Sequence, residues 1–136
     1  MSNRSKPFRC QLDLESGVPV YRQIIDQITG SIAAGKLTRG DQLPTVRQLA
    51  VDLSINPNTV IRAYRELEIR GLLETQQGAG TFVSGQKVQR DEAERRRQLD
   101  QLVGDFVARA GSAGFAISEL VESLQDLQGD ERKKRR

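Results

Sequence analysis

The fold is decided by the stretch TVRQLAVDLSINPNTVIRAYREL, residues 45–67. Thr45 and Gln48 have the spacing of a capping box, in which a hydroxyl and an amide satisfy backbone donors at the start of a helix. The apolar face of this first helix consists of Val46, Leu49, Ala50 and Leu53. Asn56 and Pro57 are suited to cap and begin a second helix. Because only three residues connect the two helices, the stretch predicts a helix-turn-helix.

The second helix of this motif has two faces of different character. Its core face consists of Val60, Ala63, Tyr64 and Leu67. At about 100° per residue, the opposite face holds Asn58, Arg62, Arg65 and Ile69, with Ile61 between the two. Arginine and asparagine are the residue types that read guanine and adenine in the major groove. On any single helix such residues are also ordinary surface, so a DNA-reading role needs support from the rest of the chain.

The segment before this motif predicts a further core helix. Pro19 suits the first position of that helix, and Gly35 suits its C-terminal stop. In the loop that follows, Leu37 and Leu43 are expected to plug into the core. The apolar residues that recur at helical spacing between the two ends are Tyr21, Ile24, Ile25, Ile28 and Ile32.

The segment after the motif predicts a β-hairpin. Gly71 ends the preceding helix, and residues 72–76 and 81–84 are the two short strands. Gly78 and Gly80 occupy the turn, where the missing Cβ permits close approach to a phosphate backbone or another surface. Three helices closed by such a hairpin make a winged helix.

The sequence after Gly85 predicts two helices, each with one apolar stripe. A break at residues 111–114 separates the stripes, and Ser118 is the expected cap of the second helix. Two such helices cannot bury their apolar faces as an isolated pair, so the winged helix or, preferably, a second subunit covers them. The residues expected at a dimer interface are Leu99, Leu102, Val103, Phe106, Leu120, Val121 and Leu124.

Together these elements predict a mainly α protein with a small β-hairpin, in which a winged helix-turn-helix precedes a two-helix dimerisation extension. The predicted parts are a leader (1–17), a DNA-binding domain (18–85), a helical dimerisation region (86–128) and a basic disordered tail (129–136).

The composition restricts the chemistry of the chain. With 136 residues there is little room for a multi-domain active site, and without histidine no Ser-His or Cys-His nucleophile pair can form. The single cysteine, Cys10, has no internal disulfide partner. No apolar run reaches the roughly 18 residues of a membrane span, and no secretory signal is present. We therefore predict a cytoplasmic protein that is not an enzyme and that holds no metal or cofactor.

One set of motifs is distinctive: LPTVRQLA at 43–50, NPNTVIRAY at 56–64, GLLE at 71–74 and GAGTFV at 78–83. Together they resemble the DNA-binding domain of the GntR family of bacterial transcription regulators, and with the short two-helix extension the chain is similar to the YtrA subfamily. The resemblance implies that the third helix lies in the major groove while the wing touches the minor groove or backbone. It also implies DNA contacts by Arg47, Thr59 and Gly78.

The chain departs from that family at two positions of the recognition helix. Many members carry arginine where Pro57 and Ile61 stand here. Base reading is therefore expected to shift to Asn58, Arg62 and Arg65. The predicted function is a homodimeric, sequence-specific regulator, most simply a repressor, that binds a palindromic operator in double-stranded DNA. A winged-helix protein-interaction module is the alternative, and the basic outward face argues against it.

Overall fold

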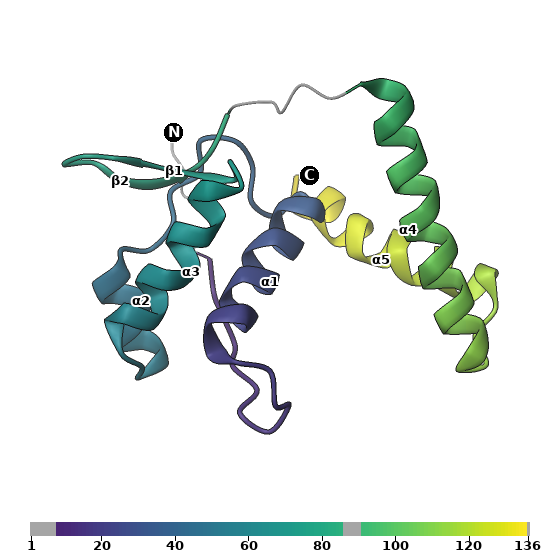
Figure 1. The fold of residues 1–136 in the computed structure, drawn as a ribbon, viewed down its shortest axis with the longest axis horizontal. Helices are drawn as coiled ribbons and strands as arrows, with labels where there is room; N and C mark the ends of the chain where they lie inside the picture. Colours follow the sequence, from purple (N-terminus) through teal and green to yellow (C-terminus); the bar gives the residue numbers. More distant parts are fainter. Residues whose placement is uncertain (1–7, 86–90, 136) are drawn as a thin grey trace. The chain divides into compact units, whose positions relative to one another are not determined.

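The computed structural model describes residues 8–85 and 91–135 of the chain. The chain divides into two compact units, one ending at residue 86 and the other beginning at residue 87 (Figure 1). We refer to the described parts as the winged-helix unit, 8–85, and the C-terminal unit, 91–135.

The winged-helix unit contains three helices and a two-stranded antiparallel sheet, which confirms the predicted fold class. In chain order these elements are α1 (Val20–Ala33), α2 (Val46–Leu53), α3 (Pro57–Ile69), β1 (Leu73–Gln76) and β2 (Gly80–Val83).

The core of this unit is centred on α3, which packs against α1, α2 and β1. Ile24, Val60 and Leu67 are completely buried within it. The expected core face of α3 is confirmed, and so is the burial of Leu37 and Leu43 from the loop before α2. The periodicity of apolar residues therefore predicts correctly which face of each helix lies inside.

Local signals set the helix ends. At the start of α2, the Gln48 N–H donates to the Thr45 hydroxyl at 3.0 Å and the Gln48 amide oxygen accepts from the Thr45 N–H at 3.0 Å, so the capping box is confirmed. Gly35 and Gly71 follow α1 and α3 with φ of +82°, as expected for helix stops. Pro19 is not the first helical residue but the residue before it, since α1 begins at Val20.

The wing is joined to the loop before α2. Its two strands pair from Leu73 opposite Val83 to Gln76 opposite Gly80. The first strand begins one residue later than predicted and ends as predicted, and both limits of the second strand lie one residue earlier. Gln42 forms a further bridge to β2, with the Leu43 N–H donating to the carbonyl oxygen of Thr81 at 2.8 Å. The hairpin is therefore anchored to the segment that leads into the helix-turn-helix.

The predicted leader packs against α1 from residue 8 onward. The Gln23 side chain accepts from the Asp13 N–H at 2.8 Å and donates to the carbonyl oxygens of Asp13 and Val18 at 2.9 and 2.8 Å. One turn later, the Gln27 side chain accepts from the Gln11 N–H at 2.9 Å. The leader residues that reach the core are Phe8 and Cys10. Hydropathy reveals only part of this attachment, because two glutamine amides also make it through backbone groups.

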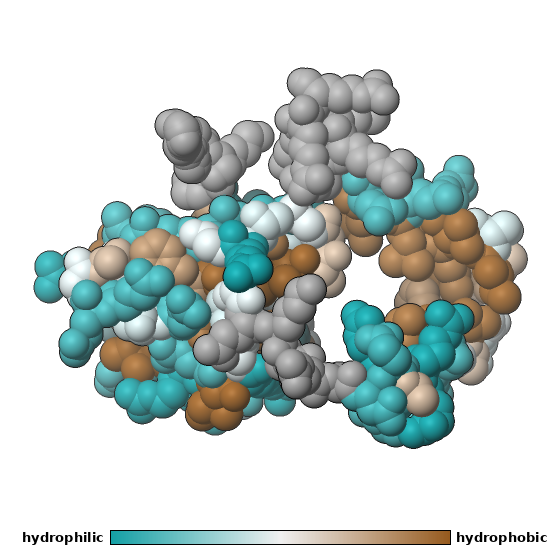
Figure 2. All heavy atoms as spheres, turned by 90° about the horizontal axis from the view of Figure 1, so that it is seen from above, coloured by the Kyte–Doolittle hydropathy of each residue, from teal (hydrophilic) through white to brown (hydrophobic). Residues whose placement is uncertain are grey.

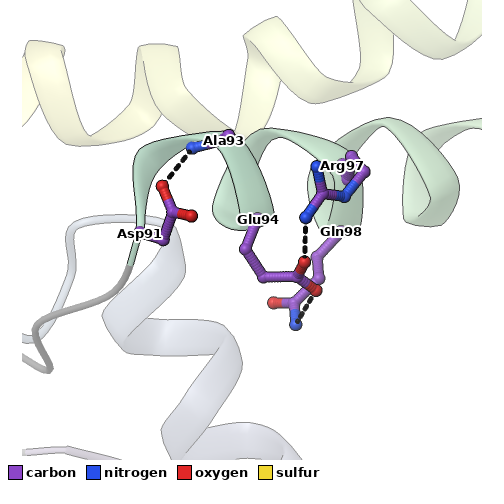
Figure 3. A network of polar contacts seen from close by, with 5 residues as sticks. All are labelled: Asp91, Ala93, Glu94, Arg97 and Gln98. Carbon is purple, nitrogen blue, oxygen red and sulfur yellow. Dashed lines mark hydrogen bonds and ion pairs between the residues drawn. The ribbon is translucent and has the colours of Figure 1, made fainter.

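The C-terminal unit consists of two helices, α4 (Glu92–Ser112) and α5 (Ile117–Arg135). Asp91 caps α4 by accepting from the Ala93 N–H at 3.0 Å, and Glu94 then pairs with Arg97 and accepts from the Gln98 amide at 3.4 Å (Figure 3). These contacts all lie on the exposed surface, so they support the helix itself rather than any packing. No described helix is long and apolar enough to cross a membrane.

Two expectations about α5 are wrong. Ser118 is not its cap, because the helix begins at Ile117 and the Glu119 carboxylate accepts from the Ala116 N–H at 2.8 Å. A glutamate three residues into a helix can satisfy that donor without any capping hydroxyl. The helix also continues to Arg135, where a disordered tail is predicted.

Candidate nucleic-acid interface

The outward surface of α3 contains an open hollow of about 430 Å³. Asn58, Arg62 and Arg65 are exposed there, on the helix face opposite the buried Val60 and Leu67. The complete lining is Asn58, Ile61, Arg62, Arg65, Glu66 and Ile69. We call this surface the α3 face. It combines hydrogen-bond donors with apolar contact area on a single helix, which is what the reading of base edges requires.

The start of α3 is held by its own cap. The Asn56 side chain accepts from the Asn58 N–H at 2.8 Å, and Pro57 occupies the first helical position. Thr59, a predicted DNA contact, lies half-buried in this first turn. Its N–H donates to the carbonyl oxygen of Asn56 at 3.0 Å, so its backbone is part of the cap.

The two arginines of α3 and Arg70, its C-cap, have different surroundings. The guanidinium of Arg62 lies over the ring of Tyr21 from α1, 3.7 Å from the ring centroid. The Arg70 Nε lies 3.2 Å from the Glu66 carboxylate, one helical turn earlier. Within the described residues, Arg65 has neither an ion pair nor a ring contact.

Two further predicted contacts lie outside the α3 face. Arg47 is the second residue of α2 and is exposed. Gly78 is exposed at the wing tip with φ of +80°, a backbone conformation that glycine adopts without strain. Next to it, the Gln42 amide donates to the carbonyl oxygen of Ala79 at 3.1 Å, so the tip is tied to the loop before α2. The structure thus gathers Asn58, Arg62 and Arg65 in one hollow, whereas the remaining candidates lie on α2, the first turn of α3 and the wing.

Tyr64 joins α3 to the segment just before α2. This tyrosine is buried in the core, as predicted, and its hydroxyl donates to the carbonyl oxygen of Pro44 at 2.7 Å, just before the α2 cap. Burial raises the pKa of the Tyr64 hydroxyl, and the charge of a Cys10 thiolate raises it further. The tyrosine therefore stays protonated and keeps its donor.

Sequence reasoning missed the supporting residues Tyr21 and Gln42. Tyr21 is placed correctly on the core-facing side of α1, but it is only half-buried, and its ring is also the surface on which Arg62 rests. Gln42 lies in a loop without periodicity. The sequence signal for Tyr21 is that an aromatic residue stands at the start of α1. Gln42 has no such signal.

The candidate dimerisation residues lie on α4 and α5 and remain largely open to solvent. No residue of α4 is buried, and within the described residues α4 and α5 approach each other closely at no more than a few positions. Phe106 is 48% exposed and Leu102 is 68% exposed. In the space-filling view, apolar side chains gather on this unit (Figure 2). Leu99, Val103, Val121 and Leu124 are likewise exposed, and Leu120 is partly covered.

Comparisons with known proteins agree on one family. Residues 20–83 match the family of bacterial regulatory proteins called the gntR family. The chain is 38% identical to the HTH-type transcriptional repressor YtrA of Bacillus subtilis over 88% of this chain and 92% of that protein. It is 36% identical to the HTH-type transcriptional regulator YhcF of the same organism, over 82% of this chain and 91% of that protein. Among solved structures, YtrA from Sulfolobus acidocaldarius, a GntR-family transcription factor, is 35% identical to this chain, with a TM-score of 0.56. The match covers 73% of this chain and 97% of that one.

Proposed function

Since the chain belongs to the GntR family of bacterial transcription regulators and carries that family's DNA-binding domain, we propose that it is a homodimeric repressor of a palindromic operator. The observation that carries the proposal is the α3 face, where Asn58, Arg62 and Arg65 project from the second helix of a helix-turn-helix. In this proposal α3 enters the major groove, where arginine pairs with guanine and asparagine with adenine.

The other predicted contacts complete the footprint on DNA. Arg47 and Thr59 lie at the starts of α2 and α3, where backbone N–H groups and the helix dipoles favour phosphate oxygens. Gly78 brings the wing tip against the backbone or minor groove. These residues position the protein, and the α3 face supplies the sequence preference.

The proposed dimer forms through the C-terminal unit. The apolar stripes of α4 and α5 have no core of their own, and a second copy of this chain would cover them. A twofold dimer places two α3 helices on two half-sites, which explains a palindromic operator. The corresponding domains are 18–85 for DNA binding and 86–128 for dimerisation.

Repression follows from occupancy. A dimer on two half-sites blocks access to a promoter that overlaps them, and the relative from Bacillus subtilis named above carries the name of a repressor. Because its ligand would be chromosomal DNA, the protein would act in the cytoplasm.

The experiment is selection of duplexes from a randomised pool by the full-length protein, followed by binding measurements at several salt concentrations. We expect a sequence with twofold symmetry, and a fall in affinity with salt of about −0.9 in log–log slope per phosphate contacted. Arg62→Ala should weaken binding by about 1–3 kcal/mol and relax the preference at one position in each half-site. Arg97→Ala removes the same charge from the exposed face of α4 that lies opposite its apolar stripe, and serves as the control.

Two outcomes would overturn parts of the proposal. If no duplex is retained even at low salt, the protein does not bind DNA, and the protein-interaction module becomes the better interpretation. If the selected sequences lack twofold symmetry, the palindromic operator is wrong.

A further inference from the structure

We propose that Tyr21 is a positioning residue for sequence recognition, because its ring holds the guanidinium of Arg62 in place on the α3 face. The inference rests on the proposed function and adds a residue from α1 that makes no base contact itself. Its basis is the stacking of Arg62 over the Tyr21 ring, with 3.7 Å between the guanidinium carbon and the ring centroid.

The ring is itself held by the core. Tyr21 is half-buried and packs against the core cluster, one turn before the completely buried Ile24 and two turns before Ile28. The helices α1 and α3 pack directly on each other. The position of the ring relative to α3 is therefore set by the packing of two helices rather than by a flexible side chain.

Stacking leaves the arginine free to read a base. A guanidinium carries its five N–H donors in its own plane, whereas a ring below it engages only its face. The in-plane donors of Arg62 remain available for a bidentate contact with O6 and N7 of guanine. An ion pair works differently: the Nε of Arg70 is directed at the Glu66 carboxylate at 3.2 Å.

The contrast with Arg65 indicates a division of roles. Arg65 lines the same hollow but has no ion pair or ring contact among the described residues, so its side chain loses more freedom on binding. A side chain that is already ordered gains affinity because less entropy is lost in the complex. Arg62 is therefore the pre-organised base reader of the α3 face, and Arg65 is a reader whose side chain becomes ordered only on binding.

The test uses the full-length protein and a duplex that the wild type selects from a randomised pool. Tyr21→Leu removes the ring and should weaken binding to this duplex about two- to fivefold, the usual contribution of an exposed cation–π contact. Discrimination at the base position that Arg62→Ala relaxes should fall by the same factor. Binding to a non-specific duplex should not change, and Tyr21→Phe, which keeps an aromatic ring, should behave like the wild type.

A double-mutant cycle separates positioning from a general structural effect. In the Arg62→Ala background, Tyr21→Leu should have no further effect on binding, because there is no guanidinium left to hold. Thermal melting of each variant checks the fold, and Tyr21→Met replaces the leucine variant if that protein does not fold.

Each remaining outcome has a definite meaning. The positioning role is overturned if Tyr21→Leu weakens specific and non-specific binding equally, leaves both unchanged, or tightens binding because Arg62 must leave the ring to reach DNA. It is also overturned if the effect persists in the Arg62→Ala background. If the wild type selects no duplex, the proposed function and the positioning role fall together, whereas a selected duplex that ignores Tyr21 overturns the positioning role alone.

Discussion

Leu67 of α3 is completely buried, whereas Phe106 of α4 keeps 48% of its surface exposed. Both residues lie on apolar helix stripes that have the same periodicity in the sequence. The winged-helix unit surrounds its stripes with α1, α2 and the hairpin, but within the described residues α4 has no buried side chain. The comparison shows that an apolar stripe indicates a need for a partner without indicating whether that partner belongs to the same chain.

A charge placed on the open stripe of α4 should change the protein most. In a twofold dimer, Phe106→Asp buries two unpaired carboxylates, and leaving a buried charge unpaired costs about 3–5 kcal/mol each. Sedimentation should then show a monomer at concentrations where the wild type is a dimer, and operator binding should fall with it. The matched control is Leu14→Asp in the winged-helix unit, where Leu14 is 78% exposed. A Phe106→Asp protein that still sediments as a dimer would remove this stripe from the interface.

A smaller effect tests the internal bonds of the winged-helix unit. Tyr64→Phe removes the donor to the Pro44 carbonyl and should lower the free energy of unfolding by about 1–3 kcal/mol in urea titrations. Because burial raises the pKa of Tyr64 in the folded state, the unfolded chain loses its proton first. The stability that Tyr64 contributes is therefore complete below its ordinary pKa of 10.0 and falls as the pH rises above it.

The loss of stability at alkaline pH should be much weaker in Tyr64→Phe. It should persist in Tyr21→Phe, which keeps the buried Tyr64 hydroxyl. Burial also raises the pKa of the Cys10 thiol. The part of the stability loss that is due to Cys10 begins near pH 9.0 and should remain in both variants. Identical pH profiles for the wild type and Tyr64→Phe would contradict the assignment.

The smallest effect compares the two units through their helix caps. Thr45→Ala removes the capping box of α2 and should lower the free energy of unfolding by about 1 kcal/mol, because α2 is part of a packed core. Asp91→Ala removes the cap of α4, which has no buried residue, and should lower only the helical signal in circular dichroism. Equal losses in the free energy of unfolding would mean that the two units unfold together.

Most of the winged-helix unit can be predicted from its sequence because its signals are local. The capping box, the Asn56-Pro57 start of α3 and the stops at Gly35 and Gly71 depend on residues within one helical turn. The start of α5 was predicted wrongly for the same kind of reason. Two capping chemistries, a hydroxyl at Ser118 and a carboxylate at Glu119, are adjacent there, and the carboxylate makes the bond.

The helix-turn-helix, the wing and the polar residues of the α3 face can all be read from the sequence, because periodicity and capping act between neighbours along the chain. Three contacts appear only in the folded protein: Arg62 rests on Tyr21, Gln42 holds the wing tip, and Gln23 ties the leader to α1. These contacts join residues that are separated in sequence. They depend on how helices and loops dock, and side-chain packing across the core sets that geometry rather than any pattern along the chain.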